Sequence, residues 1–456
     1  MLTTKTNEDD SRLSFWSRVR EFAVPPSMIE NATARRRVGD WAGACAAAGF
    51  DVEFDMRATA RIHGRALATE IRSDLRYLAP DLLRWHLPRI APAGLLRPGS
   101  TITLARYPRG GAGDLHLVVR TAPAWAEAGQ RVGLALWDGS GSKLGPHPHP
   151  HPRPDRRFRM DLHRHLWDAR RSDELRIRCG AEPDVDRVEP DPTLLEIAPP
   201  EHGYAVERWG AEARILLDDE GRAGNTFLVR SAAGHRIIAE LGPTSVRIAT
   251  AYPAGAVSAL PVLPYAATWR PPDLELLRAE AISPDRLHPL VAAALAPGCS
   301  PSEQVPASIR AERTHSVECG GRQHRIGLVD GVLSALDHDP DEIRREELLA
   351  ALTGTPVPCL QAIDRAHRRP DCLEGVGERL AHGDVAGALR VVEGLLGPEA
   401  ILREGALRDL LTAAAEQRIT HGLYRSGLSE PQLTPEYPGA RRPRARRAHP
   451  RHATRD

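Results

Sequence analysis

Residues 101–107 read Thr-Ile-Thr-Leu-Ala-Arg-Tyr, residues 115–120 read Leu-His-Leu-Val-Val-Arg, and residues 131–137 read Arg-Val-Gly-Leu-Ala-Leu-Trp. Apolar and polar side chains alternate through most of the first two segments, which is the period of a β-strand. The glycine-rich run 109–114 and the run 138–141 have the composition of turns. This stretch therefore predicts three neighbouring antiparallel strands joined by short turns.

Helical patterns precede these strands. Residues 34–50 and 57–78 carry apolar side chains close to helical spacing, and Pro80 ends the second of these segments. Asp81 is placed to cap a short third helix, which Pro88 ends. Helices followed by antiparallel strands are typical of an α+β protein, and this is the fold class that we predict.

Two further regions complete the expected secondary structure. A β-rich middle domain is expected around residues 202–270, with short strands at 214–217, 226–229, 235–239 and 246–249. Residues 325–428 have the strongest helical pattern, and there Asp339, Pro340 and Glu342 form an N-terminal capping sequence. We therefore expect an all-helical C-terminal domain.

Shifts in composition divide the chain further, and its length of 456 residues predicts roughly three domains. In chain order we predict a flexible arm (1–30), an α+β domain (31–140), a His- and Pro-rich linker or loop (141–154), a β-rich domain with flanking helices (155–296), a linker (297–315), a helical domain (316–428) and a disordered Arg-rich tail (429–456).

The basic residues are almost all arginine. Only Lys5 and Lys143 are lysines among 61 Lys and Arg residues, which indicates a genome rich in G and C. An arginine cluster is therefore weaker evidence for phosphate binding here than in an average protein. The formal net charge is +1, so the composition predicts no strongly charged partner for the chain as a whole.

The cysteines and the N-terminus bear on the compartment. No two of the six cysteines form a CxxC motif and their spacings match no zinc ribbon or finger, so we interpret them as scattered core residues: Cys45, Cys179, Cys299, Cys319, Cys359 and Cys372. The first ten residues are polar, and no stretch of 18 apolar residues occurs. The sequence thus predicts a cytoplasmic protein without a membrane partner.

Asp161, His163 and His165 form the first candidate site. On a strand the three side chains would share one face and suit a metal ion or acid–base chemistry. On a helix Asp161 and His165 would pair as i,i+4 neighbours, and His163 would point elsewhere. Apolar residues recur at every fourth position from 158 to 166, which favours a helix over 155–179 and ordinary surface or core histidines.

A tract of alternating histidines and prolines is the second candidate. His147, His149 and His151 would lie on one side of an extended chain, where a transition metal could bind them. The prolines limit how closely the imidazoles converge, and no carboxylate or thiolate adjoins them before Asp155. We therefore interpret the tract as the composition of a loop.

An acidic segment before the C-terminal helices is the third candidate. Asp339 is expected to cap the helix, and Asp341 and Glu342 complement its positive end. Asp337 and His338 are not needed for capping. This pair therefore stays open as a functional group.

No motif names a reaction. The sequence contains no P-loop, no glycine-rich dinucleotide motif after a strand, no HExxH and no GxSxG. We therefore hypothesise an accessory or adaptor protein that acts through protein–protein contacts and needs no cofactor. The alternative is a hydrolase that uses a divalent metal such as zinc, with Asp161, His163 and His165 as ligands and Asp161, His165, Asp337 and His338 as catalytic residues.

Two segments are candidates for contacts with other macromolecules. An exposed Trp85 flanked by Arg84 and Arg89 would suit an interface with a protein partner, and the alternative is a tryptophan buried at a domain boundary. Nucleic-acid binding by the tail is a weaker alternative, because no aromatic residue is interleaved to stack on bases. The tail residues concerned are Arg441, Arg442, Arg444, Arg446 and Arg447.

Overall fold

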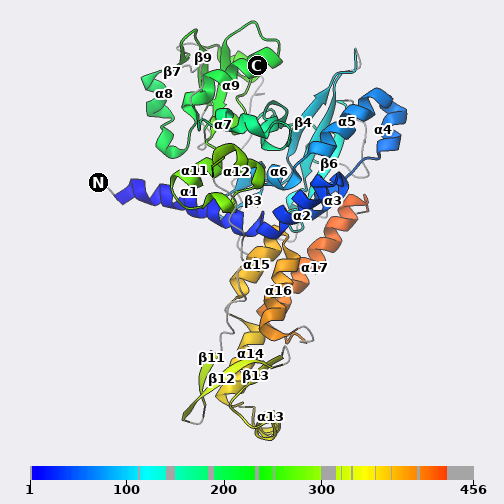
Figure 1. The fold of residues 1–456 in the computed structure, drawn as a ribbon, viewed down its shortest axis with the longest axis vertical. Coiled ribbons are helices and arrows are strands. Elements are labelled where there is room, and N and C mark those ends of the chain that lie inside the picture. The colour runs from blue at the N-terminus through cyan, green and yellow to red at the C-terminus, as the bar shows by residue number, and fades with distance from the viewer. Residues whose placement is uncertain are drawn as a thin grey trace, which may run out of the picture.

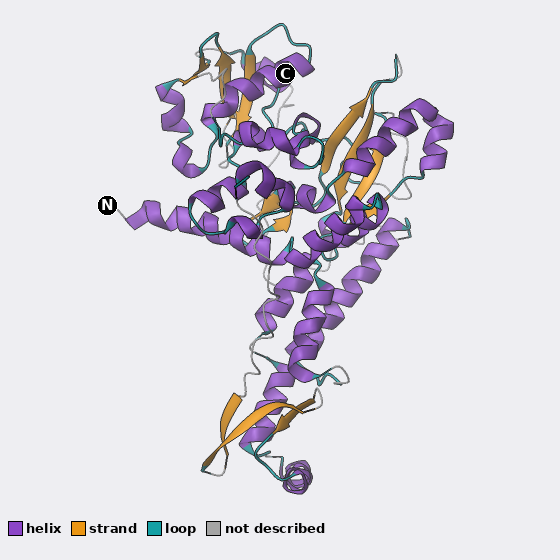
Figure 2. Cartoon of the chain, in the orientation of Figure 1, coloured by secondary structure: helices purple, strands orange, loops and turns teal. Residues whose placement is uncertain are grey.

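The structure is a computed structural model, which describes residues 3–110, 113–139, 149–182, 189–231, 236–249, 252–298, 315–319, 321–329, 332–354, 356–370, 372–397 and 401–428. In this part of the chain the protein is mixed α+β, which confirms the predicted fold class. A broad body formed by residues 3–298 carries a narrow arm formed by residues 315–428 (Figure 1). The strands lie in small sheets surrounded by helices (Figure 2).

The predicted three-stranded meander is confirmed at the centre of the body. Strand β5 pairs antiparallel with β4 and with β6, and β1 adds a parallel edge to β6. The bounds are β1 Phe50–Val52, β4 Thr101–Tyr107, β5 Leu115–Thr121 and β6 Val132–Trp137. Almost all residues of β5 are buried, as expected for a central strand with neighbours on both sides. A separate hairpin joins β2 Arg89–Ile90 to β3 Leu95–Leu96.

Six helices precede and surround this sheet. Their bounds are α1 Thr3–Phe22, α2 Pro26–Arg37, α3 Trp41–Ala47, α4 Met56–His63, α5 Arg65–Tyr77 and α6 Pro80–His86. Helix α1 corrects the expectation of a flexible arm over residues 1–30. Its apolar residues Phe15, Trp16 and Val19 recur at helical spacing and join the body's main core, so tertiary packing stabilises a segment with little intrinsic pattern. The helix expected at 57–78 is two helices, separated at Gly64 with φ 91°.

The middle of the chain forms a second sheet with its own core. Strand order is β7-β10-β9-β8. The bounds are β7 Glu189–Pro190, β8 Thr226–Arg230, β9 Arg236–Leu241 and β10 Ser245–Ile248. The strand predicted at 214–217 is wrong, because this segment belongs to helix α9 Trp209–Asp219. Trp209, Ala213 and Leu216 are buried at helical spacing and pack on the sheet.

Short helices connect the two sheets and return the chain to the first core. Apolar residues at 158–179 and 274–294 pack into the core of the first sheet, and only residues 194–267 build the second core. The predicted domain boundary at 155–296 therefore does not match the packing. Helix η1 Ala124–Ala126 lies between β5 and β6 of the first sheet. The other short helices are η2 Met160–Leu162, η3 Arg164–Leu166, η4 Ser172–Glu174, α7 Leu175–Arg178, α8 Pro192–Ile197, η5 Pro200–His202, η6 Val206–Arg208, η7 Ala254–Ala259, α10 Tyr265–Thr268, α11 Pro272–Arg278, η8 Pro284–Arg286 and α12 Pro289–Leu295.

The arm begins with strands, which corrects the expectation of an all-helical C-terminal domain. An antiparallel sheet of β11 His315–Cys319, β12 Arg322–Val329 and β13 Val332–Ala335 lies at its far end (Figure 1). The helices that follow are α13 Pro340–Thr353, α14 Pro358–Arg368, α15 Leu373–His382, α16 Val385–Leu396 and α17 Ala406–Arg425. The predicted cap is confirmed, since the Asp339 side chain accepts a hydrogen bond from the Asp341 backbone N–H.

The near end of the arm is fixed to the body by specific contacts. Gly383 packs directly on Gly129, so that a Cβ atom at Gly383 would lie 2.0 Å from the Gly129 carbonyl oxygen. In α17, Tyr424 packs edge-on against Trp125 with ring centroids 5.3 Å apart. None of the described helices is long and apolar enough to cross a membrane.

Candidate functional site

The candidate group Asp161, His163 and His165 is divided among other partners. Asp161 accepts hydrogen bonds from Arg159, with Nε 2.9 Å from Oδ1, whereas His163 Nε2 lies 3.1 Å from Glu212 Oε2. The segment forms short 3₁₀ turns in place of the helix expected at 155–179. Arginine–aspartate pairs two residues apart, such as Arg157 with Asp155, recur along it. Such pairs do not face each other on a helix, so they favour turns.

A buried charge cluster connects this segment to α9. Arg178 and Arg208 each donate to the Glu212 carboxylate at 2.8 Å, and His163 faces the same carboxylate. Burial opposes ionisation of Glu212, but His163 and the arginines hold its pKa well below the usual range. Burial also lowers the pKa of His165. The cluster contributes to packing between the two cores of the body.

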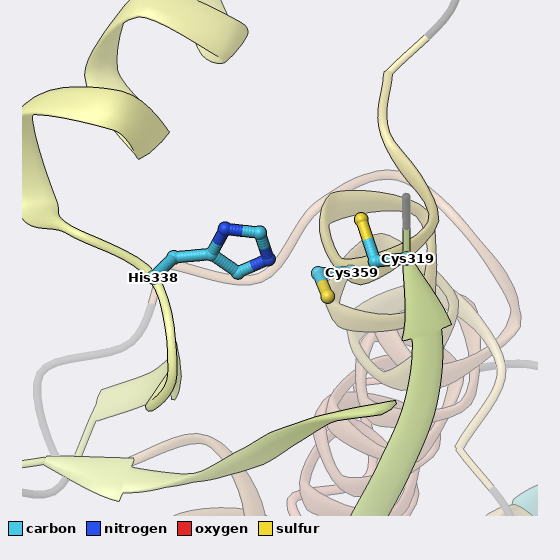
Figure 3. Close-up of side chains that lie close together, drawn as sticks. All are labelled: Cys319, His338 and Cys359. Atoms are coloured by element: carbon cyan, nitrogen blue, oxygen red, sulfur yellow. The ribbon is translucent and has the colours of Figure 1, made fainter. Parts of the chain in front are cut away.

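The pair Asp337 and His338 separates into two different roles. Asp337 accepts hydrogen bonds from the Arg325 guanidinium, with Nη2 2.8 Å from Oδ1, and this bond lowers the pKa of Asp337 to about 2. His338 points instead toward Cys319 and Cys359 (Figure 3). The four residues proposed for the hydrolase do not converge, since Asp161 and His165 lie in the body and Asp337 and His338 in the arm.

Cys319, His338 and Cys359 bring their ligand atoms within 4.8 Å of one another. Among the described residues this is the only such group of three or more histidine, cysteine or acidic side chains. The sequence did not reveal it, because the cysteines are 40 positions apart and meet only through contact of β11 with the first turn of α14. His338 was the single member that sequence reasoning had singled out.

The remaining sequence candidates differ in exposure, and some of them lie outside the described residues. His149 is buried, with Nε2 3.0 Å from the Thr121 carbonyl oxygen, and His151 is exposed. Neither takes part in a cluster of ligands, and His147 lies outside the described residues. The linker residues 299–314 and the tail arginines within 441–447 also lie outside the described residues.

Trp85 and Arg84 are buried, which corrects the expectation of an exposed interface and agrees with the alternative of a tryptophan inside a boundary. Trp85 Nε1 donates to Asp273 Oδ2 at 2.7 Å. Arg89, the third residue of this group, is half-buried and donates to the carbonyl oxygens of Gly94 and Arg84. Of these three residues, Trp85 and Arg89 line a large cavity.

The cavity has a volume of about 800 Å³ and lies between α1, the β2 hairpin and the segment of α10 and α11. Its apolar wall is rich in aromatic rings: Phe15, Trp16, Trp85, Phe158, Tyr265 and Trp269. Its basic side chains are arginines and histidines: Arg12, Arg18, Arg89, Arg97, Arg159, Arg270, His86 and His202. No aspartate or glutamate appears among the described residues that line it.

The arginines differ in how their charge is balanced. Acidic partners outside the cavity wall neutralise four of the six arginines: Arg12 through Glu275 at 2.7 Å, Arg18 through Glu378, Arg159 through Asp161 at 2.7 Å and Arg270 through Glu207 at 3.4 Å. Arg89 bonds only to carbonyl oxygens, and burial lowers its pKa to about 9. The described residues offer Arg97 no ion pair. The cavity therefore has a net positive lining.

A neutral histidine lies in the cavity floor. Burial lowers the pKa of His86 to about 3, and its Nε2 has no hydrogen-bond partner in the described chain. That atom lies 4.0 Å from Asp273 Oδ2, and burial raises the pKa of Asp273. His86 thus offers an uncharged imidazole to a ligand.

Comparisons with known proteins add no relative. No protein-family model, no curated protein and no solved structure matches this chain. The cavity of the body and the cysteine–histidine cluster of the arm are thus the features from which a function can be argued.

Proposed function

We propose that the body binds an organic anion that has a flat, apolar framework. The observation that carries this proposal is the cavity of about 800 Å³ whose described lining combines aromatic rings and arginines without one carboxylate. Cavities of this size that are mainly apolar and contain a few polar groups are the usual form of small-molecule sites.

The absence of acidic residues from the described lining is stronger evidence for an anionic ligand than the presence of arginines. The codon bias raises the frequency of arginine everywhere, but it does not remove acidic residues, which number 60 in 456, or about one in eight. A cavity that excludes them favours a negatively charged ligand, because neither the half-buried Arg89 nor the exposed Arg97 in its lining has an ion pair with a described carboxylate. The aromatic side chains of Trp16 and Trp269 in the lining suit an apolar, aromatic framework.

We propose binding in preference to catalysis. The described lining residues include no carboxylate and no thiol, and burial lowers the pKa of His86 to about 3, which makes it a weak general base for the remaining candidate nucleophile, Ser14. His86 is better placed to exchange a hydrogen bond with the ligand, because its free nitrogen is already desolvated.

Titration with 8-anilinonaphthalene-1-sulfonate, an anion with a flat naphthalene ring, tests this proposal. We expect energy transfer from cavity tryptophans to the bound dye. The Arg97→Gln variant should weaken binding roughly 10-fold, because a hydrogen bond to a charged group contributes about 1.5–3 kcal/mol. Arg247→Gln, at a largely exposed position on β10, is the matched control.

The neutral dye N-phenyl-1-naphthylamine separates charge recognition from apolar binding. Weaker binding of this dye would support an anion site. Equal affinity for both dyes, together with no effect of Arg97→Gln, would contradict the proposal.

A second candidate function, docking of a protein partner, is favoured by helix α13. Its side chains Leu348, Leu349 and Leu352 are 63%, 52% and 86% exposed at the far end of the arm. Grouped apolar side chains of this kind are typical of interaction surfaces. We propose this helix as the docking element of the adaptor function.

Co-purification from the native host tests the adaptor function. A genuine partner should be retained by the wild-type chain and by Glu347→Ala, a change on the same helix. Replacing the three leucines by serine should release it. The same set of proteins bound to all three forms would exclude α13 as the docking element.

A further inference from the structure

Three elements of the arm present the cysteine–histidine cluster. Cys319 is the last residue of β11, His338 lies between β13 and α13, and Cys359 is the second residue of α14. Figure 3 shows the imidazole of His338 directed at the two thiols from the opposite side. Cys319 and Cys359 are 6% and 0% exposed, so the cluster is shielded from solvent.

The histidine is oriented as a metal ligand would be. His338 Nδ1 lies 3.6 Å from Glu342 Oε2, and its buried Nε2 has no hydrogen-bond partner among the described residues. A carboxylate on one ring nitrogen commonly fixes a histidine whose other nitrogen binds a metal. The unpartnered nitrogen faces the cysteines (Figure 3).

A second imidazole, that of His324, lies against the ring of His338. His324 of β12 stacks on His338 with ring centroids 4.1 Å apart and an interplanar angle of 12°. The Nδ1 atom of His324 is also buried without a partner in the described chain. Two buried imidazole nitrogens without partners, of which the one on His338 lies beside the two thiols, are costly unless a ligand satisfies them.

The far end of the arm also lacks a core that would hold it together. Its buried apolar side chains are few: Cys319, Ile326, Cys359 and Ile363. No residue between 315 and 368 belongs to a hydrophobic cluster of the described chain. Modules this small are commonly stabilised by a metal ion or a disulfide.

We propose that Cys319, His338 and Cys359 bind one zinc ion that holds β11, α13 and α14 together. Two thiolates and one imidazole are ligands that zinc prefers. The ligand atoms, now within 4.8 Å, would need to close only to the roughly 3.5 Å typical of a tetrahedral site. Binding releases the two thiol protons to solvent, and water takes the fourth position.

Metal analysis of the full-length chain tests the proposal. After expression with added zinc, the wild type and the control Cys372→Ser should contain equimolar zinc by plasma mass spectrometry. Cys319→Ser, Cys359→Ser and His338→Ala should each lose it. Glu342→Gln keeps all three ligands and should weaken zinc affinity about 10-fold, because it removes the carboxylate that orients His338.

Two further measurements on the wild type do not depend on a variant's folding. Cobalt substitution should give thiolate-to-cobalt charge-transfer bands and the visible spectrum of a tetrahedral ion. Chelation should increase hydrogen exchange in β11, β12 and α14 and leave the body unchanged.

Three results would overturn the proposal. The first is wild-type protein free of zinc after supplementation. The second is zinc retained when Cys319 and Cys359 are both serine. The third is a disulfide between these cysteines in protein purified under reducing conditions, which would assign the thiols to a redox bond.

Discussion

Arg84 shows how a single buried cation can organise this molecule. It is 1% exposed and forms no ion pair with a described carboxylate. Its guanidinium donates to the carbonyl oxygens of Ala23 at 3.0 Å, Gln130 at 2.6 Å and His382 at 3.0 Å. Ala23 and His382 lie at the C-terminal ends of α1 and α15, where helix dipoles are negative. These dipoles replace the missing carboxylate, although burial still lowers the pKa of Arg84 to about 10.

The variant Arg84→Met should lower the free energy of unfolding by about 3–5 kcal/mol, because it leaves several buried carbonyl groups without donors. Arg84→Lys should cost less, since an ammonium group can satisfy some of them. Urea unfolding at pH 7 measures both changes, with Arg247→Met as the exposed control. A loss below about 1 kcal/mol for Arg84→Met would show that water satisfies these carbonyls.

At the scale of the element, the end of α15 carries a histidine that should sense acid. His382 is fully buried, and its Nε2 lies 3.0 Å from the Ala93 carbonyl oxygen. Burial, with a further contribution from Arg89, lowers its pKa from 6.5 to about 4. Between these values the unfolded chain binds a proton that the folded chain does not. Stability therefore falls as the pH decreases from about 6.5 to 4.

The variant His382→Gln should flatten this pH dependence by about 2–3 kcal/mol, because glutamine can still donate to the Ala93 carbonyl group but does not titrate. The free energy of unfolding should be measured in urea at pH 7 and pH 4.5. His151→Gln, at an exposed position, should leave the slope unchanged. An unaltered slope in His382→Gln would assign the acid sensitivity to other buried groups such as His86.

Elements with local signals were predicted from the sequence, and elements that depend on distant contacts were not. The meander of β4, β5 and β6 has alternating strands and glycine turns, and α13 has a complete cap. Helix α1 lacks such signals and is stabilised by packing on the core. Strand β12 is largely exposed and β13 is mostly half-buried, so neither shows a clear alternation of buried and exposed residues.

At the scale of the whole molecule, the candidate sites could not be predicted, because each combines segments that are far apart in the chain. The cavity unites residues from α1, from the end of α6 and from the start of α11. Among these segments, the sequence predicts a binding role only for the one around Trp85, and that role is a surface contact. The spacing of Cys319 and Cys359 likewise matches no metal-binding motif, because the two cysteines come together only through the tertiary structure.

The junction of body and arm depends on two glycines in direct contact. Gly383 has φ 88°, and a Cβ atom there would lie 2.0 Å from the Gly129 carbonyl oxygen. Gly354 ends α13 with φ 74° and has open space around its Cα. The two positions therefore share the backbone strain of an alanine substitution but differ in the contact with the body.

Gly354→Ala should cost about 1 kcal/mol from backbone strain alone, whereas Gly383→Ala should cost roughly 1–3 kcal/mol more, because the backbones must separate. Small-angle X-ray scattering should show a displaced arm in Gly383→Ala and an unchanged profile in Gly354→Ala. Hydrogen exchange should rise around Gly129 only in Gly383→Ala, because in that variant α15 no longer covers the turn at Gly129. Equal effects of the two substitutions would mean that the arm is held by α17 and that the glycine contact contributes little.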